Sequence, residues 1–537
     1  MYDVELTRSE FLIQDDEVIL ETTVGGLLRE VAQAVPDQLA LVEIDETGAN
    51  GRRWTYKQLL QDAEDIARSL TTRYEPGERV CVWAPNIPEW VLLEYACSLA
   101  GLTLVTANPA YQVQELAYVL EQSRSVALFR TASFRGNPMA EIADEAVQGL
   151  PNLRDVIDIE DWDALLAQGQ KSPQLPLVSA SDPAQIQYTS GTTGFPKGAV
   201  LSHRGITNNA RFYAERTGAT PRAPWATMMP LFHTAGCGMA VLGSLQSRSP
   251  LFLVKLFGPE PVLEMIEREG IVATGGVPTM LVAMLEVMEN RAFDLSALET
   301  FMSGGSMVAP DLVEKITTAL GCTFQTVYGQ TECSPLVTQH HVGEALADIS
   351  TTVGQPMPQT EVSIRSTDKN SVVAIGDVGE ICVRGYCTML EYNDNPEATK
   401  ATIDDDGWLH TGDLGTMDAR GYVAVTGRVK EMIIRGGENL FPAEIENVLL
   451  THPSVAEVAV VGLPDEKWGE VVAAFIRPAE GFDVDPETLK THCRAEMAAI
   501  KTPVVWSKVN SFPLTGSGKI QKFQMRDNYL SGKLRAI

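Results

Sequence analysis

Apolar and polar residues follow two alternating periods along the N-terminal part of the chain. Residues 21–44 begin with an amphipathic run, ETTVGGLLREVAQAVPDQ, and end with a short apolar run, LALVEI, and residues 54–86 repeat this order. Apolar spacing near 3.6 predicts a helix, whereas a short apolar run between turn residues predicts a buried strand. The same order returns in residues 86–108, 114–130 and 259–278. This alternation predicts an α/β fold in which several βα units form parallel sheets.

The pattern changes after about residue 353. The stretches TEVSIRS, VVAIGDVGEICVRGY and GYVAVTGRVKEMIIRGG are short alternating runs separated by Gly and Asp, which predicts a small β-rich section. From residue 443 onward, amphipathic and apolar runs followed by PETLKTHCRAEMAAI indicate a compact α+β unit. We therefore predict a large N-terminal domain of βα-layered sheets with a β-rich subdomain over residues 1–429, and a small mobile α+β domain over residues 430–537.

Charge and cysteine usage narrow the class of protein. The 537 residues include 70 acidic and 42 basic side chains, a formal net charge of −28, which argues against nucleic acid or an anionic membrane as a partner. No stretch has the length and apolarity of a membrane span, and the start MYDVELTRSE lacks a signal-peptide pattern. Eight scattered cysteines in mainly apolar stretches predict buried, reduced thiols and a cytoplasmic location rather than disulfides or a zinc site.

Residues 188–198, YTSGTTGFPKG, are rich in glycine and hydroxyl side chains and contain one lysine. Glycine frees backbone N–H groups to face a concavity, so this composition suits a phosphate-binding loop, with a surface linker as the alternative. The Walker A pattern does not fit, because Lys197 follows Pro196 rather than glycine and Gly198 occupies the place of Ser or Thr. A P-loop kinase or GTPase is therefore disfavoured.

The loop matches, nearly letter for letter, the signature of the adenylate-forming superfamily, which includes acyl-CoA synthetases, luciferases and peptide adenylation domains. Further stretches follow in the superfamily's order and approximate spacing, namely MMPLFHTAGCG (228–238), MSGGSMV (302–308), TVYGQTEC (326–333), GWLHTGDLG (407–415), GRVKEMIIRGGEN (427–439) and PLTGSGKIQK (513–522). The chain therefore resembles the acyl-CoA synthetase branch of this superfamily over essentially its whole length.

The resemblance implies an ATP site built from several motifs. Tyr328 would stack on adenine, Asp413 would bind the ribose hydroxyls with help from Arg428, and Thr331 would contact the α-phosphate. Glu332 would ligate the Mg²⁺ that accompanies ATP and prepares pyrophosphate to leave. Lys197, Thr331 and Glu332 belong to the implied catalytic set. The other implied nucleotide-binding residues are Thr189, Ser190, Gly191, Thr192, Thr193, Gly194, Gly305 and Ser306.

The acid site is implied around His233, Cys237 and Gly304, and His233 lies between an apolar strand and a Gly-rich turn. A histidine held only by backbone groups is the alternative for His233. Peptide adenylation domains place an aspartate nearby to hold the substrate amine, and PLFHTAGCGM contains none. An amino-acid substrate is therefore disfavoured.

The C-terminal motifs imply a domain that moves between two catalytic states. Lys430 occupies the hinge position, and Gly436, Gly437 and Glu438 would contact coenzyme A, although a glycine pair also suits a hairpin turn. Lys519 would enter the active site only for adenylation, where a cation stabilises negative charge on the phosphoryl oxygens. A solvated surface lysine is the alternative for Lys519.

Other candidate chemistry is weak. His340 and His341 are adjacent, so they do not share a face of a helix or strand and make a poor metal pair. No G-x-S-x-G elbow marks a serine nucleophile.

The resemblance implies a two-step ligase that uses ATP, Mg²⁺ and coenzyme A. A carboxylate attacks ATP to form acyl-AMP and pyrophosphate, and the CoA thiol then displaces AMP. Small residues around the acid site favour a medium- or long-chain fatty acid, or a bulky cyclic acid, over acetate. The alternatives are an enzyme that loads a separate carrier protein, which the short stretch after IQK disfavours, and a non-catalytic nucleotide sensor on the same fold. The oligomeric state stays open, with a homodimer as one option.

Overall fold

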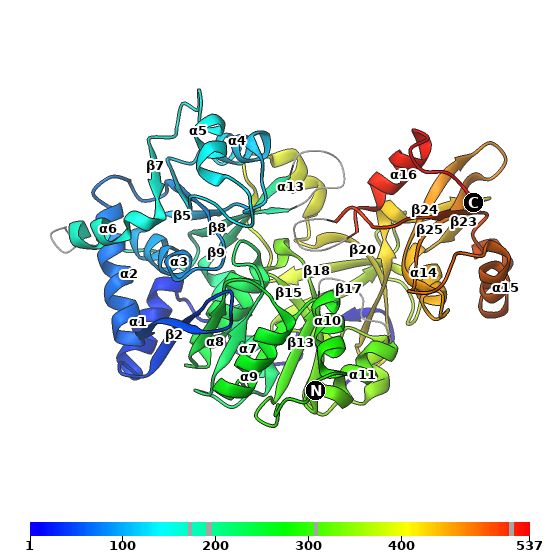
Figure 1. The fold of residues 1–537 in the computed structure, drawn as a ribbon, viewed down its shortest axis with the longest axis horizontal. Coiled ribbons are helices and arrows are strands. Elements are labelled where there is room, and N and C mark those ends of the chain that lie inside the picture. Colours follow the sequence, from blue (N-terminus) through cyan, green and yellow to red (C-terminus); the bar gives the residue numbers. More distant parts are fainter. Residues whose placement is uncertain (170–173, 190–195, 305–309, 515–519) are drawn as a thin grey trace. The chain divides into compact units, whose positions relative to one another are not determined.

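The computed structural model describes residues 1–169, 174–189, 196–304, 310–514 and 520–537. The chain forms two compact units. Figure 1 shows the helices and strands, coloured along the sequence from the N-terminus to the C-terminus. Unit 1 contains residues 1–3, 11–362 and 383–409, and unit 2 contains residues 4–10, 363–382 and 410–537. Unit 2 therefore combines part of the β-rich section with all residues that follow it.

The larger sheet of unit 1 has nine strands in the order β16-β15-β14-β13-β12-β10-β11-β2-β3. Their bounds are β2 Leu39–Ile44, β3 Asn50–Thr55, β10 Trp225–Thr227, β11 Leu251–Val254, β12 Ala273–Gly276, β13 Thr300–Gly304, β14 Thr323–Gly329, β15 Leu336–Gln339 and β16 Gln355–Pro356. The six strands from β14 to β2 pair in parallel, and antiparallel strands close both edges. The parallel sheet predicted from the sequence pattern is confirmed.

The second sheet of unit 1 has seven strands in the order β19-β9-β8-β5-β4-β6-β7. Their bounds are β4 Arg79–Trp83, β5 Thr103–Thr106, β6 Ala127–Arg130, β7 Asp155–Asp158, β8 Pro183–Thr189, β9 Lys197–Ser202 and β19 Glu391–Tyr392. Strands β8, β5, β4, β6 and β7 pair in parallel. Strand β9 returns antiparallel to β8, and the short strand β19 adds to β9 at the edge.

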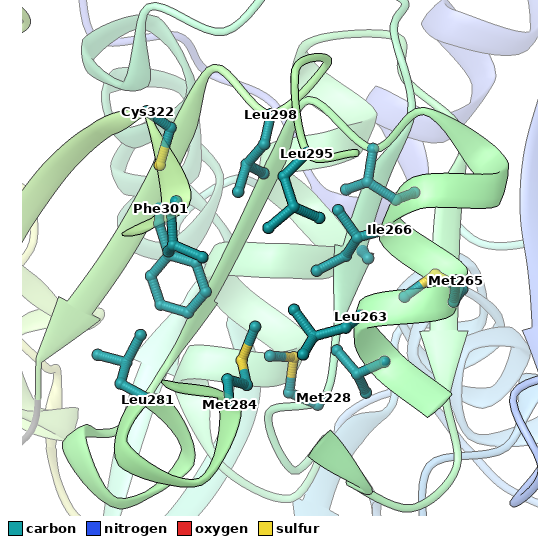
Figure 2. Close-up of a cluster of buried hydrophobic side chains, with 14 of the residues drawn as sticks. Met228, Leu263, Met265, Ile266, Leu281, Met284, Leu295, Leu298, Phe301 and Cys322 are labelled. Carbon is teal, nitrogen blue, oxygen red and sulfur yellow. The ribbon is translucent and has the colours of Figure 1, made fainter. Parts of the chain in front are cut away.

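Helices cover these sheets. Those of unit 1 are α1 Val24–Ala34, α2 Tyr56–Leu70, α3 Pro88–Ala100, α4 Val113–Gln122, α5 Met139–Ala146, α6 Trp162–Gly169, α7 His203–Thr217, α8 Gly243–Gln246, α9 Pro259–Glu269, α10 Pro278–Met288, α11 Pro310–Leu320, α12 Leu346–Thr351 and α13 Pro396–Thr402. Apolar faces of α9, α10 and α11 pack on the nine-stranded sheet, where Leu263, Met284 and Phe301 are buried together (Figure 2). Helix α3 is buried along its whole length, as expected for a segment that is apolar on nearly all sides.

Two further sheets lie mainly in unit 2. The first has the order β1-β17-β18-β20-β21, with β1 Glu10–Phe11, β17 Thr360–Arg365, β18 Gly379–Gly385, β20 Leu409–Met417 and β21 Val423–Arg428. The second has the order β23-β22-β25-β24, with β26 on β25, and the bounds are β22 Ile433–Arg435, β23 Glu438–Leu440, β24 Val455–Asp465, β25 Gly469–Pro478 and β26 Val505–Lys508. The helices of unit 2 are α14 Pro442–Leu450, α15 Pro486–Glu496 and α16 Lys522–Leu530.

Strand β24 shows why the second sheet is covered on both faces. Val458 and Val460 belong to a core that includes α14 and α15, whereas Ala459 and Val461 belong to a core that includes α16. Successive side chains of a strand point to opposite faces, so a continuous apolar run buries both.

The β-rich section differs from the predicted pattern at two points. Within the β-rich section, residues 372–377 lie outside any strand apart from one isolated bridge, and a 3-10 helix over Val429–Glu431 separates β21 from β22. All eight cysteines are free and buried, as predicted. Within the described ranges, no helix has the length and apolarity needed to cross a membrane.

Candidate active site

The glycine-rich loop is framed by a β-hairpin. Strands β8 and β9 pair antiparallel, with Tyr188 opposite Gly198 and Thr189 opposite Lys197, so both ends of the loop are fixed. A Cβ on Gly198 would lie 2.8 Å from Ile186 Cγ2, which explains why this position needs glycine. The predicted phosphate-binding residues Ser190, Gly191, Thr192, Thr193 and Gly194 lie outside the described residues, whereas Thr189 and Lys197 lie at the two strand ends.

Two adjacent parallel strands carry the predicted adenine and acyl motifs at their carboxyl ends. Gly304 ends β13 and pairs with Val327 on β14, next to the buried Tyr328. A Cβ on Gly304 would lie 2.6 Å from Val327 Cγ2, so a side chain there would push the strands apart. Ligands of open α/β sheets bind outside the carboxyl ends of the strands, and this edge fits that rule. Gly305 and Ser306 follow Gly304 but lie outside the described part of the chain.

Thr331 and Glu332 lie on a single 3-10 turn, Thr331–Cys333, directly after β14. The carboxyl group of Glu332 is buried, and its Oε1 accepts a hydrogen bond of 2.6 Å from the hydroxyl of Tyr392. The ring of Tyr392 in turn lies beneath the ammonium group of Lys197, with Nζ 4.7 Å from the ring centroid. A carboxylate oxygen is the ligand type that Mg²⁺ prefers, so the donor chemistry of Glu332 fits this ion. The sequence analysis missed Tyr392, because only the fold brings β19 beside β9.

The acid-site motif begins with a turn and continues as a π-helix, Ala235–Leu242, rather than as the predicted Gly-rich turn alone. Helices of this type occur mostly as short features at functional sites. His233 is partly buried, and its Nδ1 accepts a hydrogen bond from the backbone N–H of Ala235 at 3.2 Å. A Cβ on Gly236 would lie only 2.3 Å from the carbonyl oxygen of Pro230, so the turn that carries His233 requires glycine.

A buried polar cluster lies behind this π-helix. The Cys237 sulfur lies 3.2 Å from Gln187 Nε2 and 3.4 Å from Gln185 Oε1, and Gln185 Nε2 donates to Glu94 Oε1 at 2.6 Å. Burial raises the pKa of Glu94 well above its ordinary value, and burial likewise raises the pKa of Cys237. Burial therefore favours the protonated form of both groups. The sequence offered one signal for Glu94, a carboxylate within an apolar helix.

The predicted ribose residues meet in unit 2. Asp413 on β20 lies opposite Arg428 on β21, and Arg428 Nε lies 2.9 Å from Asp413 Oδ1. Asp413 is 6% exposed, whereas the Arg428 side chain is 45% exposed. The contact with Arg428 therefore holds the Asp413 carboxylate in one orientation.

A second carboxylate braces the turn before Asp413. Glu380 Oε2 lies 2.8 Å from His410 Nδ1, and Glu380 Oε1 accepts from the backbone N–H of Gly412 at 2.9 Å. Glu380 and His410 form, with Cys382, a group of metal-ligand atoms within 4.8 Å of one another among the described residues. We interpret the group as a structural brace, because the carboxylate and the imidazole already satisfy one another.

The predicted CoA-binding and hinge residues lie at the surface of unit 2. Arg435 pairs with Glu438 across a two-residue hairpin whose Gly436 and Gly437 have φ values of +61° and +88°. Both glycines are therefore required by the turn itself, which was the alternative to a CoA role. Lys430 is exposed within the 3-10 helix, at the junction between the two sheets of this unit. Lys519 lies outside the described residues.

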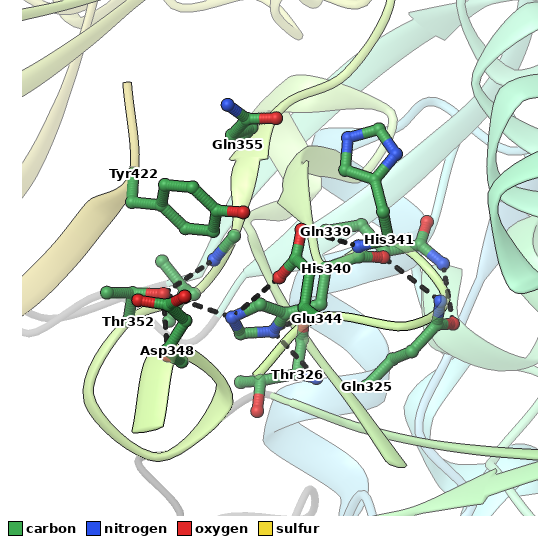
Figure 3. Close-up of polar contacts among 12 residues, drawn as sticks. Gln325, Thr326, Gln339, His340, His341, Glu344, Asp348, Thr352, Gln355 and Tyr422 are labelled. Carbon is green, nitrogen blue, oxygen red and sulfur yellow. Dashed lines mark hydrogen bonds and ion pairs between the residues drawn. The ribbon is translucent and has the colours of Figure 1, made fainter. Parts of the chain in front are cut away.

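The two adjacent histidines share Glu344: His340 Nε2 lies 3.7 Å from Glu344 Oε2, and the backbone N–H of His341 donates to Glu344 Oε1 at 3.0 Å (Figure 3). The ring of His340 is fully buried between the backbone of Thr326 and the hydroxyl of Thr352, whereas His341 Nδ1 lies 3.0 Å from the N-terminal amine.

Comparison with known proteins places this site in a family. The sequence model of the "AMP-binding enzyme" family matches residues 28–393, and that of the "AMP-binding enzyme C-terminal domain" matches residues 444–519. YngI of Bacillus subtilis is 36% identical over 95% of this chain and 97% of its own length, and the human mitochondrial medium-chain acyl-CoA ligase ACSF2 is 36% identical over 94% and 87%.

A solved structure extends the likeness to the fold. o-Succinylbenzoate-CoA synthetase (MenE) of Bacillus subtilis, in complex with its acyl-adenylate intermediate, is 28% identical with a TM-score of 0.82, over 95% of this chain and 99% of that chain. The same enzyme has been solved with ATP and a magnesium ion, with the same TM-score.

The chain therefore belongs to the AMP-binding enzymes, in the acyl-CoA synthetase branch of the adenylate-forming superfamily. It is an ATP-dependent acid–CoA ligase that proceeds through an acyl-AMP intermediate, with Mg²⁺, ATP and coenzyme A as its cofactor and co-substrates.

Proposed function

We propose that this ligase activates an uncharged acyl group of some size, a medium- or long-chain fatty acid or a bulky cyclic acid. The observation that carries the proposal is the segment Ala235–Leu242, which contains Gly236, Cys237 and Gly238 in its first turn and has no charged residue. The carboxyl group of Glu94 is hydrogen-bonded to Gln185 in the cluster behind this segment, and burial raises its pKa, which favours the uncharged form. A wall without fixed charge favours an apolar acyl chain over a second carboxylate or an amine. The medium-chain substrate in the name of ACSF2 supports the same class.

We assign the nucleotide to the residues that the motifs bring to the strand ends. Tyr328 would stack on adenine, Asp413 with Arg428 would hold the ribose hydroxyls, and Thr331 would contact the α-phosphate, with Lys197 as a neighbouring cation. Bound through Glu332, Mg²⁺ would neutralise triphosphate charge. These residues orient the α-phosphorus for attack by the substrate carboxylate and leave pyrophosphate as the departing group.

We further propose that Lys519 supplies a cation to the adenylation step. Rotation of the C-terminal domain about Lys430 would then remove Lys519 from the active site and bring in the Gly436–Gly437 hairpin for the thioester-forming step. In that step the CoA thiol attacks the acyl carbonyl, the C–O bond to AMP breaks, and the thiol proton leaves to solvent. The two family models, which end at 393 and begin at 444, support a boundary near Lys430. The eight free cysteines support a reducing compartment such as the cytoplasm.

The test measures pyrophosphate release from Mg·ATP with short, medium and long fatty acids, aryl acids and polycyclic acids, each with and without CoA. We expect turnover with one large apolar class only, dependent on CoA. Lys519→Ala should lose pyrophosphate release but should still convert supplied acyl-AMP and CoA to the thioester. Lys508→Ala is the control, because Lys508 is a surface lysine of the same unit that pairs with Asp483. This control variant should behave as wild type in both assays.

Three outcomes would contradict the proposal. Preference for acetate or an amino acid would refute the proposed acid class. Pyrophosphate release that is equal without CoA would point to a carrier protein as acceptor. Binding of ATP without turnover of any acid would favour the sensor. Size-exclusion chromatography with light scattering would show whether the enzyme is a dimer.

A further inference from the structure

Tyr392 lies on strand β19, which pairs with β9, the strand that follows the glycine-rich loop. Strand β19 pairs antiparallel with β9, with Tyr392 opposite Ala199. On either side, the backbone N–H of Leu390 donates to Val200 at 2.8 Å and that of Asn393 donates to Gly198 at 2.7 Å. The backbone that carries Tyr392 therefore cannot shift independently of β9.

The same strand is joined to the turn that carries Glu332. The backbone N–H of Met389 donates to the carbonyl oxygen of Glu332 at 2.8 Å, and the hydroxyl of Tyr392 donates to its carboxylate at 2.6 Å. Both groups of this hydrogen bond are buried, with Tyr392 6% and Glu332 8% exposed. A buried hydrogen bond to a carboxylate is among the stronger side-chain contacts in proteins.

The ring of Tyr392 has a second partner of opposite charge. Lys197 Nζ lies 4.7 Å from the ring centroid, within the range of a cation–π contact. One aromatic side chain thus holds an anion through its hydroxyl and a cation over its face. Both charged groups are fixed by Tyr392 instead of being drawn together as an ion pair.

We propose that Tyr392 is a positioning residue for Mg·ATP: its hydroxyl orients Glu332 toward the metal ion, and its ring seats Lys197 toward the phosphates. The proposal rests on the roles proposed above for Glu332 and Lys197. Loss of the hydroxyl frees the carboxylate to rotate and should weaken the Mg²⁺-dependent part of nucleotide binding. Loss of the ring should also weaken the part that does not need Mg²⁺.

The experiment measures binding of α,β-methylene-ATP by calorimetry at a series of Mg²⁺ concentrations, so that no turnover is involved. We expect Tyr392→Phe to bind the analogue normally without Mg²⁺ but to lose about tenfold in affinity at saturating Mg²⁺, the size of a lost hydrogen bond to a charged group. Tyr392→Leu should lose affinity under both conditions.

Tyr74→Phe is the matched control. The Tyr74 hydroxyl donates to Asp155 Oδ2 at 2.7 Å in the same unit, and both residues lie outside the proposed site. This variant should bind the analogue as wild type at every Mg²⁺ concentration. Thermal unfolding of the two Phe variants reports any general loss of stability, which would affect binding with and without Mg²⁺ alike.

The variant Glu332→Gln distinguishes failure of the positioning role of Tyr392 from failure of the proposed metal-binding role of Glu332. If Glu332→Gln weakens the Mg²⁺ dependence and Tyr392→Phe weakens it less but in the same direction, the positioning role is supported. If Glu332→Gln weakens it and Tyr392→Phe leaves it unchanged or strengthens it, the positioning role is wrong while the metal role of Glu332 stands. If Glu332→Gln has no effect on Mg²⁺ dependence, both assignments are overturned.

Discussion

Burial of His340 makes the stability of unit 1 depend on pH. The ring is fully buried, its Nδ1 accepts from the backbone N–H of Thr326 at 3.2 Å, and its Nε2 lies 3.0 Å from the hydroxyl of Thr352. The Nε2 atom also lies 3.7 Å from the buried carboxyl group of Glu344, but burial has the largest effect on the pKa of the ring. Burial lowers the pKa of His340 from 6.5 to about 4. Between these values the unfolded chain takes up a proton that the folded chain refuses, so stability falls as the pH falls.

The size of the effect follows from the two pKa values. The loss of unfolding free energy is close to zero at pH 7.5, about 2 kcal/mol at pH 5, and about 3 kcal/mol once the pH is well below the folded pKa. His203 is buried at a separate position in unit 1, and burial lowers its pKa to about 4 as well, so it should contribute a similar loss.

Urea titrations followed by tryptophan fluorescence at pH 7.5 and pH 5 provide the assay. His340→Gln keeps an amide near the Nε2 position and cannot be protonated, so the difference between the two pH values should shrink by about 2 kcal/mol relative to wild type. His203→Gln should shrink it by a similar amount, and the double variant should lose both contributions. If His340→Gln shows the same pH-dependent loss as wild type, His340 is not the neutral, buried group described here.

Three further predictions concern the core and the two substrate sites. Leu263→Ala should lower the free energy of unfolding by about 2–5 kcal/mol in a urea titration, because Leu263 is 0% exposed in the core of Figure 2. Asp413→Asn should raise the calorimetric Kd for ATP about 10–100-fold, the cost of a hydrogen bond to a charged group, and equal affinity would contradict the ribose role. Gly236→Ala should raise the KM for the acid while ATP binding stays unchanged, because the added Cβ would lie 2.3 Å from the carbonyl oxygen of Pro230; an unaltered KM would show that the turn is not part of the acid site.

Much of the fold follows from local sequence. The run PEPVLEMIEREGIVATGG forms helix α9 and strand β12 as its apolar spacing predicts, and PETLKTHCRAE forms α15. Where the pattern misled, backbone context decided. Residues 372–375 form an apolar run like that of a strand but pair at only one bridge, and the glycine-rich stretch after His233 continues into a π-helix. An alternating pattern needs a partner strand at the right register, which the local sequence does not specify.

The sequence by itself determined the class of this protein, because the motifs that resemble the adenylate-forming superfamily are short continuous runs of residues. It also determined the type of most elements through their periodicity. Only the tertiary structure decided which charges act together. Tyr392 contacts Glu332 and Lys197 because β19 adds to β9, and Glu94 is linked to Cys237 through Gln185 on β8. Burial and the contacts of a titratable group depend on chain segments far apart in sequence, so neither the raised pKa of Glu94 nor the lowered pKa of His340 could be predicted from the local pattern.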